Sequence, residues 1–312
     1  MRVAVTGATG FIGWHACERL RDAGWTVVAI ARPGGRAARP PGVELATAPL
    51  EAGALCRACE GAAAIVHAAG VIRAASDAEY RRVNVEGARA AAEAARSLGA
   101  RLVHISSLTA AGPACLARPE REDDPCEPIT AYGRSKLASE RVIAATPGLR
   151  WTVLRPAAVY GPRDHQFRPL FAAARRGLLP RLPNAASFFL TLVHAADLAR
   201  AIERACRADH ADGEVLFVGH PAPASLDDVL RAAAAAVGRR CRPLPVPFAL
   251  MHLAAWLGVA GITAERVREA QSPGFVCSVA RAERRLGFRA AIPLGDGFRE
   301  TAAWYRAHGW LA

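Results

Sequence analysis

Thr6-Gly7-Ala8-Thr9-Gly10-Phe11-Ile12-Gly13 joins a short apolar segment, residues 3–6, to an amphipathic segment that closes at Gly24. Glycines at this spacing permit a tight turn, a close approach of the backbone to a phosphate, and close packing of a helix on a strand. The first turn of the helix that follows attracts anions. We therefore predict a strand, a dinucleotide-binding loop and a helix, with Gly7, Gly10 and Gly13 at the cofactor.

Short β-branched runs alternate with alanine-rich helical stretches through the first half of the chain. The predicted strands are residues 3–6, 27–31, 65–67, 102–106 and 152–155, and the predicted helices are residues 12–23, 54–60, 78–98 and 132–145. Repeated β-α-β units of this kind form a parallel sheet that helices cover on both faces. The predicted fold class is therefore α/β, a doubly wound parallel sheet.

The composition of the sequence changes after Gly161-Pro162, where prolines become frequent and residue patterns typical of strands become weaker. A strand and helix over residues 191–205 are expected to return to the first domain. We therefore assign residues 1–163 and about 191–220 to the dinucleotide-binding domain, and about 164–190 and 221–312 to a smaller, mostly helical substrate-binding cap.

The longest apolar stretch covers residues 248–262 and is interrupted by His252. It is too short to span a bilayer, which needs ~20 residues. A buried helix is the first interpretation, and lining of an apolar substrate pocket or contact with a membrane surface stay open as alternatives.

Composition excludes several classes of protein. With 312 residues and 52% hydrophobic residues, the chain can bury a sizeable core. The net charge of +12 comes from scattered arginines rather than a basic stripe, so no nucleic-acid partner is expected. Residues 1–5 do not resemble a secretion signal, so a cytoplasmic location is expected. The eight cysteines are irregularly spaced, and Cys56-x-x-Cys59 has no second pair, so neither a disulfide framework nor a metal site is predicted.

The end of the second predicted strand reads Ala31-Arg32, where proteins of this fold usually carry an acid that binds the adenosine ribose. An acid repels a 2′-phosphate, whereas arginine pairs with one. Arg32 therefore favours NADP over NAD, the alternative being that Arg32 is one of many surface arginines.

Tyr132-Gly-Arg-Ser-Lys136 opens a predicted helix, so the tyrosine and lysine share one face. A nearby ammonium and a positively charged nicotinamide would both lower the pKa of the phenol toward a value useful for proton transfer. Lys136 is the only lysine in the chain, because the other 39 of its 40 basic residues are arginine. A compact ammonium that binds ribose hydroxyls cannot be replaced by a planar guanidinium, which explains the exception. Ser107, at the end of a predicted strand, is the candidate to stabilise the substrate oxygen, and Thr109 is a candidate substrate contact.

The chain resembles the extended short-chain dehydrogenase/reductase family, which includes nucleotide-sugar epimerases and dehydratases, 3β-hydroxysteroid dehydrogenases and dihydroflavonol reductases. Its marks, over nearly the whole chain, are Thr6 to Gly13, His67-Ala-Ala-Gly70, Asn84-Val-Glu-Gly87, Ser106-Ser107, Tyr132 to Lys136, Leu154-Arg-Pro156, Val159-Tyr-Gly-Pro162, His194-Ala-Ala-Asp197, and Ala282 to Phe288 through Trp304-Tyr305.

The resemblance implies a catalytic triad of Ser107, Tyr132 and Lys136. It also implies a set of residues that line the cofactor: Phe11, Ile12, Ala68, Ala69, Asn84 and Ala157, with Lys136 at the ribose. The family commonly has an adenine-binding aspartate where this chain has Pro49, so adenine recognition is expected from the backbone near Leu50.

Sugar-nucleotide epimerases of the family usually carry an arginine just before the strand at His194, where this chain reads Phe188-Phe-Leu-Thr191-Leu. Phe188 and Thr191 are therefore candidate contacts for an apolar substrate, although Arg268 or its neighbours could still bind a diphosphate.

The leading hypothesis is an NADP- or NAD-dependent reductase or dehydrogenase acting on an apolar or aromatic small molecule. The alternative is a UDP-sugar epimerase or dehydratase, and a non-catalytic dinucleotide sensor is a third reading that would not need the tyrosine and lysine. A homodimer is possible.

Overall fold

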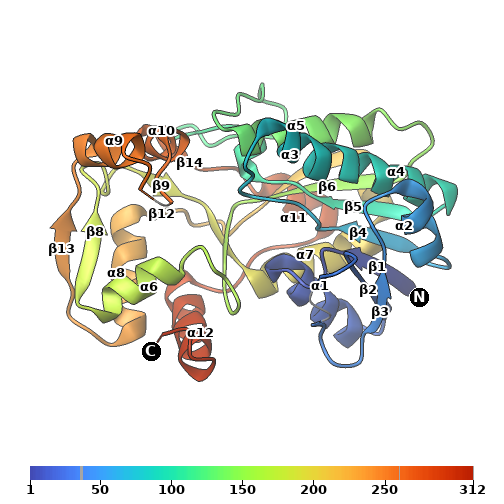
Figure 1. Ribbon diagram of the computed structural model, residues 1–312, viewed down its shortest axis with the longest axis horizontal. Helices are drawn as coiled ribbons and strands as arrows, with labels where there is room; N and C mark the ends of the chain where they lie inside the picture. The colour runs from blue at the N-terminus through green and yellow to red at the C-terminus, as the bar shows by residue number, and fades with distance from the viewer. Residues whose placement is uncertain (36–37, 260, 312) are drawn as a thin grey trace.

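A computed structural model describes residues 1–35, 38–259 and 261–311 of the chain. Its centre is a seven-stranded parallel sheet in the order β11-β6-β5-β4-β1-β2-β3 (Figure 1). The strands are β1 (Arg2–Thr6), β2 (Thr26–Ala31), β3 (Glu44–Thr47), β4 (Ala64–His67), β5 (Arg101–Ile105), β6 (Trp151–Pro156) and β11 (Glu214–Val218). The strand order reverses between β1 and β4, which confirms the predicted doubly wound α/β fold.

Helices cover both faces of the sheet, as the continuous burial of its central strands requires. The core on one face includes residues from α1 (Phe11–Asp22), α7 (Ala195–Arg207) and α11 (Ala280–Leu286). The core on the other face includes residues from α2 (Ala52–Ala58), α4 (Gly87–Ser97) and α5 (Ala131–Ala144). Six alanines of α4 are buried there, so this helix lies close against the sheet.

The helix predicted over residues 78–98 is divided into three parts. It consists of α3 (Asp77–Tyr80), a π-helical segment Arg81–Glu86, and α4. The side chain of Ser76 caps α3 by accepting a hydrogen bond from Glu79 N. A π-helical segment inside a helix often marks a functional site.

The strand predicted near residue 191 does not enter the main sheet. β10 (Leu192–His194) pairs instead with β7 (Ala158–Tyr160) in a separate two-stranded ribbon. The helix that follows, α7, does return to the core beside α1 and the sheet. The outermost strand beside β6 is β11, which the sequence analysis did not predict.

A second group of elements stands at one end of the sheet (Figure 1). Its core contains residues of α6 (Arg168–Arg175), α8 (Leu226–Val237) and α12 (Leu294–Ala307). Its short strands are β8 (Leu178–Arg181) with β13 (Arg242–Pro245), and β9 (Phe189–Leu190) between β12 (Ala224–Ser225) and β14 (Gly274–Phe275). Two further helices are α9 (Phe248–Trp256) and α10 (Ala264–Gln271).

The prediction of a buried helix over residues 248–262 is wrong. The helix is α9, it ends at Trp256, and none of its residues is buried. Hydropathy alone predicted burial, but no other described element covers the outer sides of this helix. In the part of the chain that the structure describes, no helix combines the length and the apolar character needed to cross a bilayer.

Candidate active site

The candidate site lies where the strand order of the sheet reverses. The glycine loop follows β1, and Ala68 and Ala69 follow its neighbour β4. Gly7 has a φ of +67°, and a Cβ added to it would lie 2.6 Å from Ala69 N. A Cβ added to Gly13 would lie 2.2 Å from the carbonyl oxygen of Gly7. Glycine is therefore required at both positions for the backbone to close around this point.

The first turn of α1 fits an anionic group such as a dinucleotide pyrophosphate. Gly10 caps the helix without any side-chain hydrogen bond, and no acid stands in the first turn. The amide groups of Phe11, Ile12 and Gly13 have no acceptor within the helix, because the first N–H groups of a helix never do. These amides and the helix dipole are the donor set that a phosphate needs.

The residues predicted for the adenosine end lie beyond β2 and β3. Arg32 directly follows β2 and is exposed, and the described residues that follow it, Pro33 to Gly35, include no acid. Leu50 lies against the start of α4, since a Cβ added to Gly87 would come within 2.9 Å of its side chain.

Ala157, which the resemblance places at the cofactor, is buried after β6. It donates its N–H to Val218 O at 2.9 Å.

Asn84 is buried in the π-helical segment, and its side chain is engaged by the protein itself. Its Oδ1 accepts a hydrogen bond from Val71 N at 2.8 Å, and its Nδ2 donates to Val71 O and to the Ser135 hydroxyl. Ser135 in turn donates to the carbonyl of Tyr132. Asn84 therefore fixes the loop after β4 to the first turn of α5, a positioning role that the sequence did not indicate.

Tyr132 stands in the first turn of α5, which Thr130 caps by accepting a hydrogen bond from Gly133 N. Ser107 follows β5, and its hydroxyl accepts hydrogen bonds from Thr109 N and from the Thr109 hydroxyl. The Ser107 side chain also lies near the phenol of Tyr132, whose pKa it lowers. The structure thus brings Tyr132 of α5 close to the segment that carries Ser107 and Thr109.

In the protein alone the pKa of Tyr132 is raised, whereas the sequence predicts a lowered pKa when a nearby ammonium and a bound nicotinamide act together. Burial raises the pKa of its phenol to about 12, and the nearby Ser107 side chain opposes that rise without cancelling it. The physical reason is that removal of water disfavours the phenolate more than the Ser107 hydroxyl favours it. In the protein alone, Tyr132 is therefore a protonated acid at neutral pH.

Lys136 is buried one helical turn after Tyr132, and burial lowers the pKa of its ammonium group to about 8. The carboxylate of Glu140, one turn further along α5, acts in the opposite direction. Within the described residues, Lys136 donates no hydrogen bond to another side chain, so its ammonium group is available to a ligand.

Glu140 belongs to a buried ion pair that sequence analysis missed. Arg155 donates to both of its carboxylate oxygens, at 3.0 and 2.7 Å, and the Ser106 hydroxyl donates to one of them. The spacing of Glu140 four residues after Lys136 was a possible signal, but the partner Arg155 comes from β6, and its approach depends on the tertiary fold.

Two stacked histidines lie behind Lys136. The rings of His67 and His104 are 5.4 Å apart, and burial lowers the pKa of both, for His67 to about 3. His67 is hydrogen bonded to the Thr6 hydroxyl and His104 to the Ser139 hydroxyl. Both rings are thus neutral at neutral pH, so neither histidine places a second positive charge beside the ammonium group of Lys136.

The candidate substrate residues of the cap are enclosed. Thr191 is buried, its hydroxyl accepts a hydrogen bond from Cys277 N, and a Cβ added to Gly219 would lie 2.3 Å from its methyl group. Phe188 is 8% exposed. Their contact with a substrate remains a prediction.

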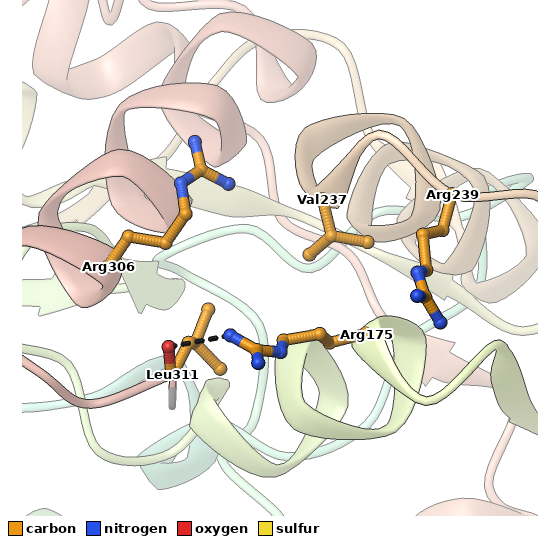
Figure 2. Close-up of a pocket in the computed structure, with 5 residues that line it drawn as sticks. All are labelled: Arg175, Val237, Arg239, Arg306 and Leu311. Carbon is orange, nitrogen blue, oxygen red and sulfur yellow. Dashed lines mark hydrogen bonds between the residues drawn. The ribbon is translucent and has the colours of Figure 1, made fainter.

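The structure has two surface cavities outside the group formed by the three catalytic candidates. One, of about 270 Å³, is lined by Arg175, Val237, Arg239, Arg306 and Leu311 in the cap, where Arg175 donates to Leu311 O (Figure 2). The other, of about 420 Å³, lies on the outer side of α3 and α5 and includes Tyr80 and Ser135. Neither contains Ser107, Tyr132 or Lys136. Over residues 1–35, 38–259 and 261–311, no group of three His, Cys, Asp or Glu side chains is placed to hold a metal ion.

Comparisons with known proteins agree with this geometry. The model of the NAD-dependent epimerase/dehydratase family matches residues 3–219. A ceramide reductase from Caulobacter vibrioides is 34% identical, over 99% of this chain and 96% of its own. A 4-hydroxy-2-methyl-3-oxo-4-farnesyl-3,4-dihydroquinoline-1-oxide ketoreductase from Stigmatella aurantiaca is 29% identical, over 83% of this chain and 80% of its own. The solved structure of MoeE5 in complex with UDP-glucuronic acid and NAD is 26% identical, with a TM-score of 0.80, over 99% of this chain and 100% of that one. The chain belongs to the NAD-dependent epimerase/dehydratase family, as an enzyme of the extended short-chain dehydrogenase/reductase type.

Proposed function

We propose that this enzyme is an NADP(H)-dependent reductase that converts a carbonyl group of an apolar small molecule to a secondary alcohol, or catalyses the reverse reaction. The observation that carries the proposal is the contact of the Ser107 hydroxyl with the Tyr132 phenol, with Lys136 buried one turn further along α5.

These three residues divide the proton chemistry between them. A bound nicotinamide would supply or accept the hydride at the carbonyl carbon. Tyr132, protonated at neutral pH, donates its phenolic proton to the carbonyl oxygen as the alcohol forms. Ser107 donates a hydrogen bond to the same oxygen, and Lys136 binds the ribose and stabilises the phenolate left on Tyr132.

The neighbourhood of the predicted substrate contacts supports an apolar substrate. Residues 184–193 contain no charged side chain. The preceding arginine, Arg181, is bound through two hydrogen bonds to Asp227, at 2.8 and 2.7 Å, and so is not free for a diphosphate. The names of two relatives, a ceramide reductase and a farnesylated quinoline-oxide ketoreductase, describe reductions of lipid-like molecules.

Arg32 supports the preference for NADP. It is exposed at the end of β2, no acid follows it in the described loop, and a guanidinium pairs well with a 2′-phosphate.

The second candidate is a UDP-sugar epimerase, and the position of Arg268 favours it. This arginine is exposed and donates to Ile129 O, three residues before Tyr132, so it stands near the site where a diphosphate would lie. MoeE5, a structural neighbour, was solved with UDP-glucuronic acid and NAD.

The test is a pair of assays on the purified enzyme. Long-chain and aromatic ketones are offered with NADPH while absorbance at the reduced nicotinamide band is followed, and UDP-sugars are offered with NAD while the sugar products are separated. The proposal expects net consumption of NADPH with ketones. Conversion of UDP-sugars without net cofactor turnover, and no ketone reduction, would instead establish the epimerase.

Tyr132→Phe tests the acid. We expect it to keep NADPH binding and to lose a factor of ~10²–10⁴ in turnover, which is the usual value of general acid catalysis. Tyr80→Phe is the matched control, because the two rings are 6.4 Å apart but the Tyr80 hydroxyl donates to Ile72 O. Equal activities of the two variants would refute the role of Tyr132.

A further inference from the structure

The exposed helix α9 is apolar apart from His252. Its nine residues, Phe248–Trp256, include no Asp, Glu, Lys or Arg, and none is buried. Half of the ten large hydrophobic residues that the structure shows exposed lie in and just after this helix: Leu250, Leu253, Trp256, Leu257 and Val259, here called the α9 surface. A helix of this composition is ordinarily buried, so the α9 surface is a candidate for contact with an apolar partner.

The border of the α9 surface carries more arginines than acids. Residues 243–264 contain no Asp, Glu, Lys or Arg, and α10 then carries Glu265, Arg266, Arg268 and Glu269. Arg73 and Glu269 both lie near Arg266, because the charge of Arg73 lowers the pKa of its guanidinium and the charge of Glu269 raises it. The neighbouring acid Glu265 is already engaged, since it pairs with Arg134 and accepts a hydrogen bond from Ala131 N. Arginines around an apolar centre match anionic headgroups around acyl chains.

Trp256 gives the α9 surface a further mark of a lipid interface. It ends the helix and is 81% exposed, which is rare for a tryptophan unless a partner covers it. Tryptophan is enriched at the boundary between headgroups and acyl chains, because its ring is apolar and its N–H is polar.

The α9 surface is also connected to the catalytic candidates. Helices α9, α10 and α5 lie along the same side of the molecule in Figure 1. α10 is tied to the start of α5 by two hydrogen bonds, from Ala131 N to Glu265 and from Arg268 to Ile129 O. Ala131 immediately precedes Tyr132, so α10, against which α9 packs, stands at the rim of the site.

We propose that the α9 surface docks on an anionic lipid bilayer, with Trp256 and its leucine neighbours among the acyl chains and Arg73, Arg266 and Arg268 at the headgroups. The docking brings Tyr132 to the membrane surface. Entry of an apolar substrate from the bilayer into the site is the consequence that rests on the proposed reductase function.

Vesicle flotation of the full chain tests the docking without any substrate. Vesicles of phosphatidylcholine with about 30% phosphatidylglycerol supply the negative surface charge, and vesicles of phosphatidylcholine alone are the comparison. We expect the protein to float with the first and to float weakly with the second. Fluorescence of Trp256 should shift to the blue on binding, and Trp256→Phe should remove the shift.

Two sets of variants locate the contact. Leu253→Ser/Trp256→Ser/Leu257→Ser should weaken vesicle binding by at least about tenfold, whereas Leu116→Ser/Leu178→Ser, exposed leucines outside the α9 surface, should leave it unchanged. Arg73→Gln/Arg266→Gln should weaken binding to the anionic vesicles by about fivefold per residue at low salt. Arg57→Gln/Arg96→Gln removes the same charge from other faces and should have a smaller effect.

Three results would overturn the proposal: no flotation of the parent protein, equal binding by the α9-surface and control variants, or a parent dimer that the triple serine variant converts to monomers without any vesicle binding. The last result would make the α9 surface a contact between two copies of the chain. Reduction of the long-chain and aromatic ketones is measured on the same protein samples. Vesicle binding without reductase activity would refute the proposed reaction and leave the docking standing, and activity without vesicle binding would do the reverse.

Discussion

Replacement of Lys136 by methionine should stabilise the cofactor-free protein at neutral pH. Lys136 is 4% exposed, and burial lowers the pKa of its ammonium group from 10.5 to about 8. A pKa difference of this size corresponds to about 3 kcal/mol, since one pKa unit is worth 1.36 kcal/mol. At pH 7 this free energy destabilises the folded protein, because Lys136 stays charged in a buried site that disfavours the charged form. Methionine keeps the straight side chain and removes the charge.

The sign of the pH dependence follows from the two pKa values. Below pH 8, Lys136 is charged in both the folded and the unfolded chain, so the full cost is present. Between pH 8 and 10.5 the folded chain loses the proton and the unfolded chain keeps it, so the parent gains stability as the pH rises. The free energy of unfolding of Lys136→Met should therefore exceed that of the parent by up to about 3 kcal/mol at pH 7, and the difference should disappear toward pH 10.5.

Urea unfolding of both proteins at several pH values between 7 and 10.5 measures this difference. The single lysine allows a direct check, because lysine labelled with ¹³C at Cε gives one side-chain signal, whose chemical shift reports the pKa of Lys136. Reductase activity should be lost in the variant, so stability and activity move in opposite directions. A signal that titrates near 10.5, or a variant that is less stable than the parent at pH 7, would refute the reasoning.

Two further substitutions test the cofactor site. Arg32→Asp should move the preference for NADPH over NADH by at least about tenfold toward NADH; steady-state kinetics with both cofactors measure this, Arg57→Asp is the control, and an unchanged ratio would show that another residue reads the 2′-phosphate. Gly13→Ala should lower the free energy of unfolding by about 1–3 kcal/mol and weaken dinucleotide binding, because the added Cβ would lie 2.2 Å from Gly7 O. Gly53→Ala, whose Cβ meets no atom closer than 3.8 Å, is its control in thermal unfolding and fluorescence titration, and equal behaviour of the two would contradict the close packing of the loop.

The parts of the fold that local sequence determines could be predicted. The glycine loop and the spacing of Tyr132 and Lys136 depend on neighbours within one β-α unit or one helical turn, and the predicted core strands needed only their apolar runs. β3 escaped prediction because Glu44–Thr47 is an edge strand with no fully buried residue, so its pattern is mixed.

The remaining differences arise from tertiary contacts. The ion pair of Glu140 with Arg155 joins a helix to a strand, and no spacing rule reveals it. The pKa of Tyr132 depends on how much water the folded chain removes from the phenol. The apolar run at residue 248 predicted a helix correctly, but a run of apolar residues does not show whether another element covers it.

The alanine face of α4 has a consequence for how this enzyme can change. A buried alanine can be replaced only by glycine or by a larger residue, so the helix has almost no room for substitutions that bring it nearer to the sheet. Nearly every substitution on this face moves α4 outward, and α4 continues directly from the segment that carries Asn84. Substitutions on this face therefore displace α4 in one direction only, away from the sheet. We expect this displacement to reach Tyr132 through Asn84 and Ser135 rather than to be removed by repacking of the core.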